Sequence, residues 1–136
     1  MAENDNLFEV KIVTPDRVLY TGEAELLEFN TIYGEIGVYK RHIPLTTVLA
    51  PGSVTIHGAG GSKVAAVHSG FAEILPDRVM MLAEIAEWPE EIDIERAKRA
   101  KERAETNLQS KDADTDTVRA EFALRKALTR INVKEI

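Results

Sequence analysis

The sequence predicts an α+β protein in which an N-terminal antiparallel β-sandwich (residues 1–88) is followed by an antiparallel hairpin of two helices (residues 89–136). Three observations predict this class. Apolar residues recur at every second position as far as Trp88 and with a helical period beyond it. Turn signals divide the first part into short runs without a helical pattern between them. The charge balance changes near the same point, from 14 acidic and 6 basic residues before Asp93 to 9 acidic and 11 basic residues from Asp93 onward.

The first part of the chain reads as a series of strands. FEVKIVT (8–14) alternates, with Phe8, Val10 and Ile12 on one face, and a turn at Pro15-Asp16 follows it. The later extended runs are RVLYT, ELLEFNT, TTVLA, SVTIHG, KVAAVH, FAEIL and RVMMLAEIAEW, and the expected separators are YGEIG, Pro51-Gly52, GAGGS, Ser69-Gly70 and Pro76-Asp77. Turns at intervals of roughly 8–12 residues are typical of an antiparallel sandwich or a flattened barrel.

The second part reads as two amphipathic helices. Asp93 is a candidate N-cap for the first helix, and Asp114 or Asp116 is a candidate for the second, within the polar segment SKDADTDT. The expected apolar stripes are Ile94, Ala97, Ala100, Ala104 and Leu108 on the first helix and Ala120, Ala123, Leu124, Ala127, Leu128 and Ile131 on the second. A short polar connection makes such helices antiparallel neighbours. Because the stripes are mostly alanine and bury little area, we expect a hairpin that needs a partner surface to be stable.

Composition excludes several classes of protein. The chain has 136 residues, 44% of them apolar, which suffices for a domain with a core. It has no cysteine, no apolar stretch near the ~20 residues of a membrane span, and an acidic start unlike a signal peptide. These features favour a bacterial cytoplasmic protein without a transmembrane segment. The net charge of −6 argues against nucleic acid as a partner.

Three groups of residues are candidates for a phosphate-binding, metal or catalytic site, and each lacks a feature that such a site needs. GAGGSK (58–63) lacks the ending of a phosphate-binding loop and precedes a strand, so we predict a hairpin turn there. His42, His57 and His68 have neither helical pairing nor thiolate company, so no metal site is predicted. Glu35 and His42 could be imagined as an acid–base pair, but no nucleophile or oxyanion motif accompanies them. No catalytic residue is therefore predicted.

The basic residues of the helical part allow two interpretations. Arg96, Arg99 and Arg103 lie three and four residues apart and would share one helical face. In the first interpretation this face is solvated and laced with ion pairs at i,i+4, namely Glu95–Arg99, Lys98–Glu102 and Lys101–Glu105. In the second, the hairpin brings Arg96 level with Lys126 and Arg130, and these cations form a site for an anion or a partner protein. The residues alone leave both interpretations open.

Three stretches resemble one known family. IVTPDR (12–17), GEIGVYKRHIPL (34–45) and EIDIERAKRAKERAE (91–105) are similar, in order and spacing, to the epsilon subunits of bacterial F-type rotary ATP synthases. The resemblance implies a sandwich of about ten strands and a helical hairpin, in a non-catalytic subunit that inhibits ATP hydrolysis. It implies as partners the gamma subunit, the membrane c-ring and, when the hairpin is extended, the alpha and beta subunits of the catalytic head. The implied location is the cytoplasmic face of the bacterial plasma membrane, as a peripheral protein.

The resemblance also implies site residues. In ATP-binding members the motif I/L-D-x-x-R-A contacts nucleotide, and here it reads Ile92 to Ala97. The implied ATP contacts are Glu87, Ile92 and Asp93 on the adenine side and Arg96, Arg103 and Arg130 on the phosphate side. Lys126 stands where strongly binding relatives carry arginine, and lysine lacks the bidentate guanidinium fork. ATP would be a regulatory ligand, with no cofactor required.

The same resemblance assigns Glu35, Tyr39 and His42 to a turn that contacts the ring. Two alternatives to a synthase subunit remain. A free-standing ATP-sensing module would not associate with the gamma subunit and the ring, and an enzyme built on a sandwich would show turnover as an isolated chain.

Overall fold

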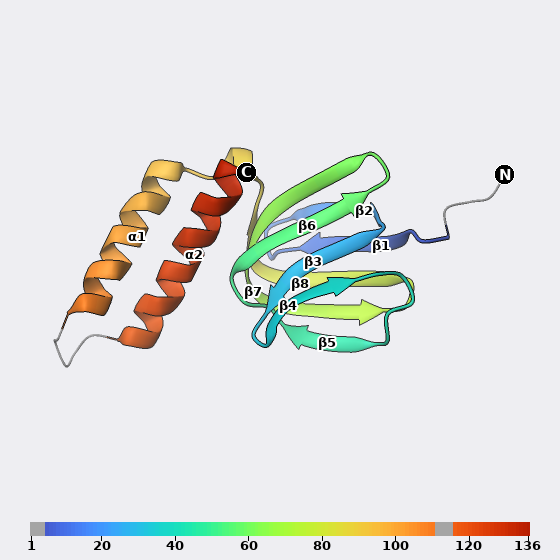
Figure 1. Ribbon diagram of the computed structural model, residues 1–136, viewed down its shortest axis with the longest axis horizontal. Coiled ribbons are helices and arrows are strands. Elements are labelled where there is room, and N and C mark those ends of the chain that lie inside the picture. The colour runs from blue at the N-terminus through green and yellow to red at the C-terminus, as the bar shows by residue number, and fades with distance from the viewer. Residues whose placement is uncertain (1–4, 111–115) are drawn as a thin grey trace.

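The computed structural model describes residues 5–110 and 116–136 and confirms the predicted fold class, with a β-sandwich followed by two helices (Figure 1). The strands are β1 (Phe8–Val13), β2 (Val18–Ala24), β3 (Leu26–Thr31), β4 (Gly34–Val38), β5 (Leu45–Val48), β6 (Gly52–Gly58), β7 (Gly61–Leu75) and β8 (Arg78–Glu87). These are eight strands in the described residues, where the resemblance implied about ten.

The strands pair in the order β2-β1-β8-β7-β6-β3-β4, and β5 pairs with β7. Most neighbours are antiparallel, as expected, but β1 and β8 run parallel, with Val10 opposite Val79 and Ile12 opposite Met81. Alternation within each strand sets which face is buried and says nothing about the direction of a partner that is distant in sequence, so the parallel pair was not predicted.

Two predicted separators are parts of strands. Tyr33–Gly37 was expected to be a turn, but Gly34–Val38 is strand β4. The turn is confined to Ile32 and Tyr33, where Tyr33 N donates a hydrogen bond to Thr31 Oγ1 (3.1 Å). Ser69-Gly70 bends β7 without ending it, with φ of 62° and 119°. The bend lets one half of β7 pair with β6 and the other half with β5.

A single large apolar cluster fills the sandwich. Its largest fully buried members include Phe29, Ile12, Leu27, Ile56, Ile74 and Met81. The alternation read from β1 is confirmed, because Phe8, Val10 and Ile12 are at most 3% exposed while Glu9 and Lys11 face solvent. Burying side chains of this size contributes about 1.5–3 kcal/mol each, so the sandwich can be stable without help from the helices.

A short 3-10 helix, η1 (Pro89–Glu91), leads into α1 (Ile94–Gln109), and α2 (Thr117–Glu135) completes the hairpin. Asp93 is the N-cap of α1, accepting from Arg96 N (3.1 Å), and Asp116 is the N-cap of α2, accepting from Arg119 N (3.0 Å). The alternative N-cap, Asp114, lies outside the described residues. The predicted stripe on α2 is partly wrong, because Leu128 is exposed, whereas Thr129 and Val133, which were not part of it, are buried.

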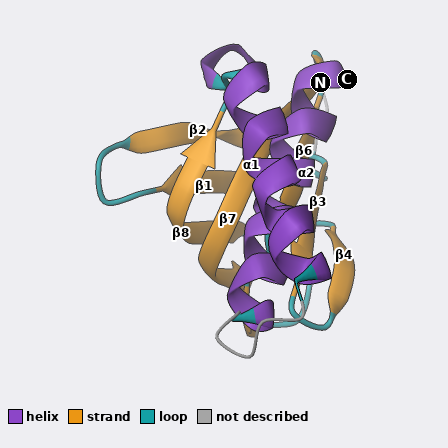
Figure 2. Ribbon diagram, turned by 90° about the vertical axis from the view of Figure 1, so that its left-hand side faces the viewer, coloured by secondary structure: helices purple, strands orange, loops and turns teal. Residues whose placement is uncertain are grey.

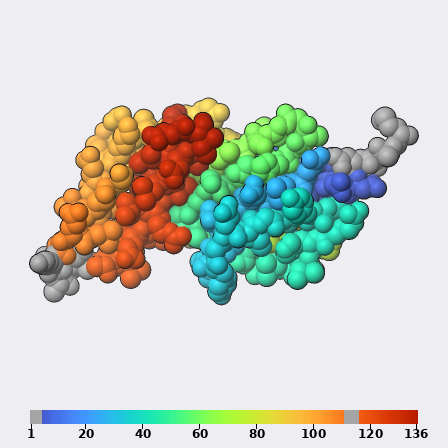
Figure 3. Space-filling model, in the orientation of Figure 1, coloured from blue at the N-terminus to red at the C-terminus, as the bar shows by residue number. Residues whose placement is uncertain are grey.

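The hairpin packs on the sandwich through one helix. Helix α2 lies against β6, β7 and η1, while α1 packs on α2 and is farther from the sheet (Figures 1 and 2). The space-filling view shows the hairpin as a separate lobe at one end of the sandwich (Figure 3). The apolar contact between the lobes is small and consists of Val64, Ala66, Ile92 and Val133. None of the described helices has the length and apolar character needed to cross a membrane.

Candidate functional site

A cavity of about 300 Å³ lies where the open end of the hairpin meets the end of β8. It is lined by Glu87, Glu91, Asp93, Arg96, Ala97, Ala100, Arg103, Ala123, Lys126, Ala127 and Arg130. Four of these side chains are cationic and three are carboxylates, and the rest are alanines. The volume is at the lower end of the roughly 300–1,000 Å³ usual for ligand sites.

The helical spacing of the sequence builds the walls of this cavity. Arg96 and Arg103 are seven residues apart, two turns of α1, and Lys126 and Arg130 are four apart on α2, so each pair shares a face. Glu87 is the last residue of β8 and enters from the sandwich. The alanines between the cations have small side chains and therefore leave space between the charged side chains of the two helices.

Each of the three carboxylates already has a partner. Glu87 Oε1 accepts from Arg130 Nε over 2.7 Å. Glu91 accepts from the two terminal guanidinium nitrogens of Arg17, at 2.7 and 2.8 Å, and from Trp88 N. Asp93 caps α1 as described above. The carboxylates therefore hold the framework of the site and leave little negative charge free to neutralise its other cations.

Three cations of the cavity have no carboxylate partner among residues 5–110 and 116–136, namely Arg96, Arg103 and Lys126. Lys126 Nζ lies 5.2 Å from the centre of the Phe122 ring. Of the ion pairs predicted along α1, only Lys101–Glu105 closes in the described residues, at 3.8 Å. The solvated-face interpretation is therefore only partly correct, and the arrangement favours an anion in the cavity.

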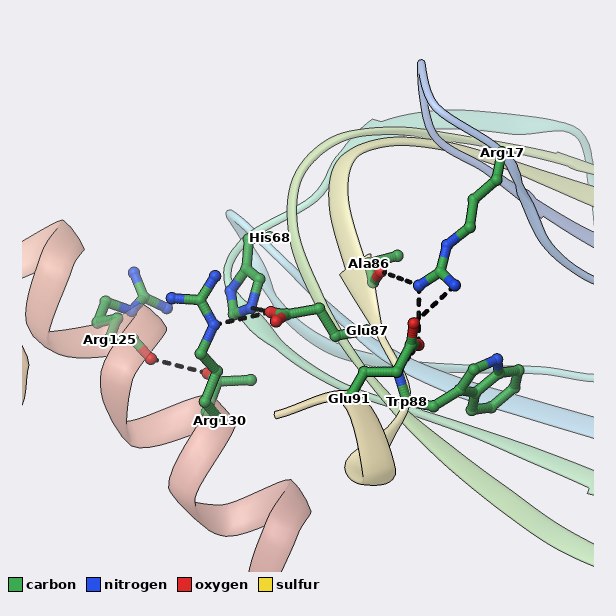
Figure 4. Close-up of polar contacts among 9 residues, drawn as sticks. Arg17, His68, Ala86, Glu87, Trp88, Glu91, Arg125 and Arg130 are labelled. Carbon is green, nitrogen blue, oxygen red and sulfur yellow. Dashed lines mark hydrogen bonds and ion pairs between the residues drawn. The ribbon is translucent and has the colours of Figure 1, made fainter. Parts of the chain in front are cut away.

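Glu87 is the most strongly perturbed acid of the site (Figure 4). Burial alone would raise its pKa, but the combined attraction of His68 and Arg130 outweighs burial and lowers the pKa to about 2. His68 Nε2 is 3.4 Å from Glu87 Oε1, which is long for a hydrogen bond, so Arg130 at 2.7 Å is the principal partner. Glu87 is consequently ionised at neutral pH.

The junction between the lobes is tied to the sandwich by Arg17 (Figure 4). The hydrogen bond from Arg17 lowers the pKa of Glu91, and Arg17 also donates to Ala86 O (3.3 Å). Trp88 packs edge-on against Tyr20, with the ring centres 6.2 Å apart. These contacts fix η1, and therefore the position from which α1 starts.

A larger hollow, of about 530 Å³, lies beside the junction and is lined by Ser62, Lys63, Val64, Trp88, Pro89 and Glu90. It is open and contains a single cation, Lys63, whose Nζ already lies 5.8 Å from the centre of the Tyr20 ring and 5.9 Å from that of Trp88. Its size exceeds that of the hairpin cavity, but it lacks converging charges, so we take the hairpin cavity as the candidate site.

The structure brings together most of the residues assigned by resemblance. Six of the seven proposed ATP contacts line the cavity, and Ile92 is buried beside it, 5% exposed, against Ala66 and Val133. The three ring residues are not one cluster. Strand β4 separates Glu35, at its start, from Tyr39 and His42, which follow its end, and His42 Nδ1 lies 2.6 Å from Ile43 O.

Sequence reasoning missed two participants in the site. Glu91 was read only as part of a motif, and its pairing with Arg17, 74 positions away, had no local signal. His68 was weighed only as a metal ligand, although it is 1% exposed and lies behind Glu87. Its position inside an apolar run, VAAVH, was the available signal, since a histidine on the buried face of a strand needs a polar neighbour.

Comparison with known proteins gives two adjoining family matches. Residues 7–89 match the family described as ATP synthase, Delta/Epsilon chain, beta-sandwich domain. Residues 90–135 match the family described as ATP synthase, Delta/Epsilon chain, long alpha-helix domain.

Individual relatives agree with these matches. The chain is 48% identical over 125 residues to the ATP synthase epsilon chain of Shouchella clausii (strain KSM-K16), covering 92% of each chain. It is 45% identical to that of Halalkalibacterium halodurans, covering 91% of this chain and 94% of the relative. Among solved structures, its fold is similar to a chain of the Euglena gracilis mitochondrial ATP synthase, with a TM-score of 0.81, 24% identity, and coverage of 94% and 81%.

Proposed function

The chain belongs to the ATP synthase delta/epsilon chain family as a non-catalytic chain, and from this premise we propose that it is a central-stalk subunit whose hairpin moves between a docked and an extended position. In this proposal the docked hairpin holds ATP in the cavity between α1, α2 and Glu87. The extended hairpin reaches the catalytic head and inhibits ATP hydrolysis. The protein would be peripheral, at the cytoplasmic face of the membrane.

One observation carries the nucleotide part of the proposal. Arg96, Arg103 and Lys126 converge on one cavity without carboxylate partners in the described residues, so their charges are available to a polyphosphate. A bound anion would bridge α1 and α2 and stabilise the docked hairpin by mass action. Each charge-assisted contact contributes roughly 1.5–3 kcal/mol before the helices are ordered, which predicts a dissociation constant in the micromolar to millimolar range.

Calorimetric titration of the full chain with ATP tests this site. Arg103→Ala should weaken binding about tenfold or more, because it removes a cation that has no other ion pair in the described part of the chain. Lys126→Arg should tighten binding, because arginine supplies a bidentate fork. Arg99→Ala is the matched control, since Arg99 is on the same helix but does not line this cavity. Absence of heat and of a melting shift at millimolar ATP would refute the site.

The structure also supports a hairpin that can leave the sandwich. Among residues 5–110 and 116–136, the main apolar core contains no residue of α1 or α2, and the apolar cluster that joins the two lobes is the small one around Val133. Their described polar links are the Glu87–Arg130 ion pair and a hydrogen bond from Lys134 Nζ to Pro89 O (2.9 Å). A docked state held by so few contacts can be balanced by a competing surface within a few kcal/mol.

Deletion of residues 93–136 tests the inhibitory role. The sandwich retains its own core, so the truncated chain should still fold and assemble with the other subunits. ATP hydrolysis by the assembled complex should rise if the hairpin inhibits it. Equal hydrolysis rates with the full-length and truncated chains would contradict the proposal.

An exposed apolar band supports a protein partner on the sandwich. Val48 lies opposite Phe71, Phe71 opposite Leu82, Leu82 opposite Val13, and Val13 opposite Val18, so five strands contribute to one row. Four of the five are 39–55% exposed. A contiguous apolar row of this kind is uncommon on an isolated protein, and we assign it to contact with the gamma subunit. Phe71→Lys should weaken that assembly, whereas Glu73→Lys, which adds a lysine elsewhere on the same strand, should weaken it less.

Contact with the c-ring is assigned to Glu35, Tyr39 and His42. The combined substitution Glu35→Lys and His42→Ala should reduce ATP-driven proton pumping in reconstituted vesicles and leave hydrolysis by the detached head intact. Undiminished pumping would remove this assignment.

A further inference from the structure

His68 is a buried histidine that faces the ion pair between the two lobes. It lies on β7 and is 1% exposed, and neither of its ring nitrogens has a hydrogen-bond partner among the described residues. Its Nε2 is 3.4 Å from Glu87 Oε1, and Arg130 Nε donates to the same oxygen over 2.7 Å (Figure 4). One carboxylate oxygen therefore stands between a histidine of the sandwich and an arginine of the hairpin.

Arg130 and His68 differ in how strongly they attract the Glu87 carboxylate. Arg130 is charged at all physiological pH values, whereas His68 attracts a carboxylate strongly only when it is protonated. The oxygen lies 2.7 Å from Arg130 Nε and 3.4 Å from His68 Nε2, which is the arrangement expected when the ring is neutral. A protonated ring would carry two N–H donors in a buried setting where both nitrogens now lack partners, and Glu87 is the nearest acceptor that can neutralise it.

We propose that His68 is a positioning residue that determines which lobe holds Glu87. Neutral His68 leaves the Glu87 carboxylate bound to Arg130 and the hairpin docked. Protonated His68 draws the carboxylate toward the sandwich and releases the Arg130 guanidinium, which weakens docking and frees a cation for an anionic ligand. The relevance to nucleotide rests on the function proposed above, but the exchange of partners does not require nucleotide.

The charged groups around His68 set the direction of the pH effect. Burial lowers the pKa of His68 first of all, Arg130 and Lys126 of α2 lower it further, and Glu87 of β8 raises it. A histidine whose pKa in the docked state lies below its ordinary 6.5 binds fewer protons in that state. The lowering by Arg130 and Lys126 exists only while the hairpin is docked, so docking favours neutral His68 and is weakened as the pH falls through the lowered pKa of His68.

NMR titration of the histidine ring signals in the full chain, without nucleotide, tests the proposal. Arg130→Gln removes the competing cation, so the titration midpoint of His68 should move upward. Glu87→Gln removes the anion, so the midpoint should move downward. In the Glu87→Gln background, Arg130→Gln should cause a smaller upward shift, because part of its effect passes through the carboxylate. His42 and His57 contact neither side chain and are internal controls whose curves should superimpose in all variants.

Two results would overturn the proposal. The first is an upward shift of the His68 midpoint by Arg130→Gln that is equally large with and without Glu87→Gln, since such a shift would come from the charge of Arg130 alone and not from a shared carboxylate. The second is a His68 signal that does not titrate in the wild type or in Arg130→Gln before the chain unfolds. Because no ATP is present, either result leaves the nucleotide site standing, and a failed ATP titration leaves the His68 assignment standing.

Discussion

The Glu87–Arg130 ion pair should contribute measurably to docking of the hairpin, and a double-mutant cycle of Glu87→Gln and Arg130→Gln isolates that contribution. Its N–O distance is 2.7 Å and its side chains are 22% and 26% exposed. A hydrogen bond between charged groups contributes about 1.5–3 kcal/mol when shielded, and an exposed pair at most about 1 kcal/mol. For this half-shielded pair we expect a coupling of about 1–2 kcal/mol, a 5- to 30-fold change in the docking equilibrium.

Native-state hydrogen exchange measures this equilibrium locally, because amides of α2 exchange when the hairpin opens while amides of β8 report the sandwich. The single variants should reduce protection in α2 more than in β8, and the double variant should lose less than the sum of the two. Arg125→Gln is the matched control, since it removes the same charge from an exposed position of the same helix. Additive losses across the cycle would show that the pair makes no contribution and would refute the reasoning.

Three further predictions concern stability. Val133→Ala removes two methyl-sized groups from the fully buried cluster between the lobes and should destabilise docking by about 1.5–3 kcal/mol, seen as lost amide protection in α2. The pKa of Glu87 is lowered from 4.5 to about 2, so the stability that its carboxylate contributes is complete above pH 4.5 and is lost as the pH falls toward 2. At about 1.4 kcal/mol per pKa unit, this contribution is at most about 3 kcal/mol. Glu87→Gln should therefore flatten that part of the curve of stability against pH. Gly70→Ala should unfold the sandwich in urea at clearly lower concentration, because φ is +119° and a Cβ would lie 2.0 Å from Leu82 O, whereas Gly60→Ala, with open space around it, is the control.

The fold could be predicted where local pattern decides structure. Alternation in FEVKIVT predicted the buried face of β1. Asp93 marked the start of the first helix, and Asp116 was one of two candidates for the second, because an aspartate side chain satisfies the free amides there. Pattern could not show that β1 pairs with β8 in parallel, nor that Ser69-Gly70 bends a strand instead of ending it. Both depend on partners that lie far away in the sequence.

The same distinction between local and long-range information applies to the candidate site. Helical spacing and the antiparallel turn were enough to place Arg96 near Lys126 and Arg130. The arrangement of the carboxylates was not accessible, because the Glu87–Arg130 and Arg17–Glu91 pairs join residues 43 and 74 positions apart. Those ion pairs decide which cations remain available to an anion. The sequence could therefore indicate which residues form the site, but not which of its cations lack a carboxylate partner.

The bidentate contact between Arg17 and Glu91 has a mechanical consequence for the proposed movement. Because it anchors η1 to the turn between β1 and β2, the proposed movement would pivot just after η1, at Ile92 and Asp93, instead of at the end of β8. From that pivot α1, with 16 residues, spans about 24 Å, and α2, with 19, about 28 Å. Laid end to end the two helices would reach about 50 Å from the sandwich, whereas a hairpin kept closed would reach about half as far. The distance to any surface that the extended hairpin contacts therefore discriminates between a hairpin that swings as a unit and one that opens.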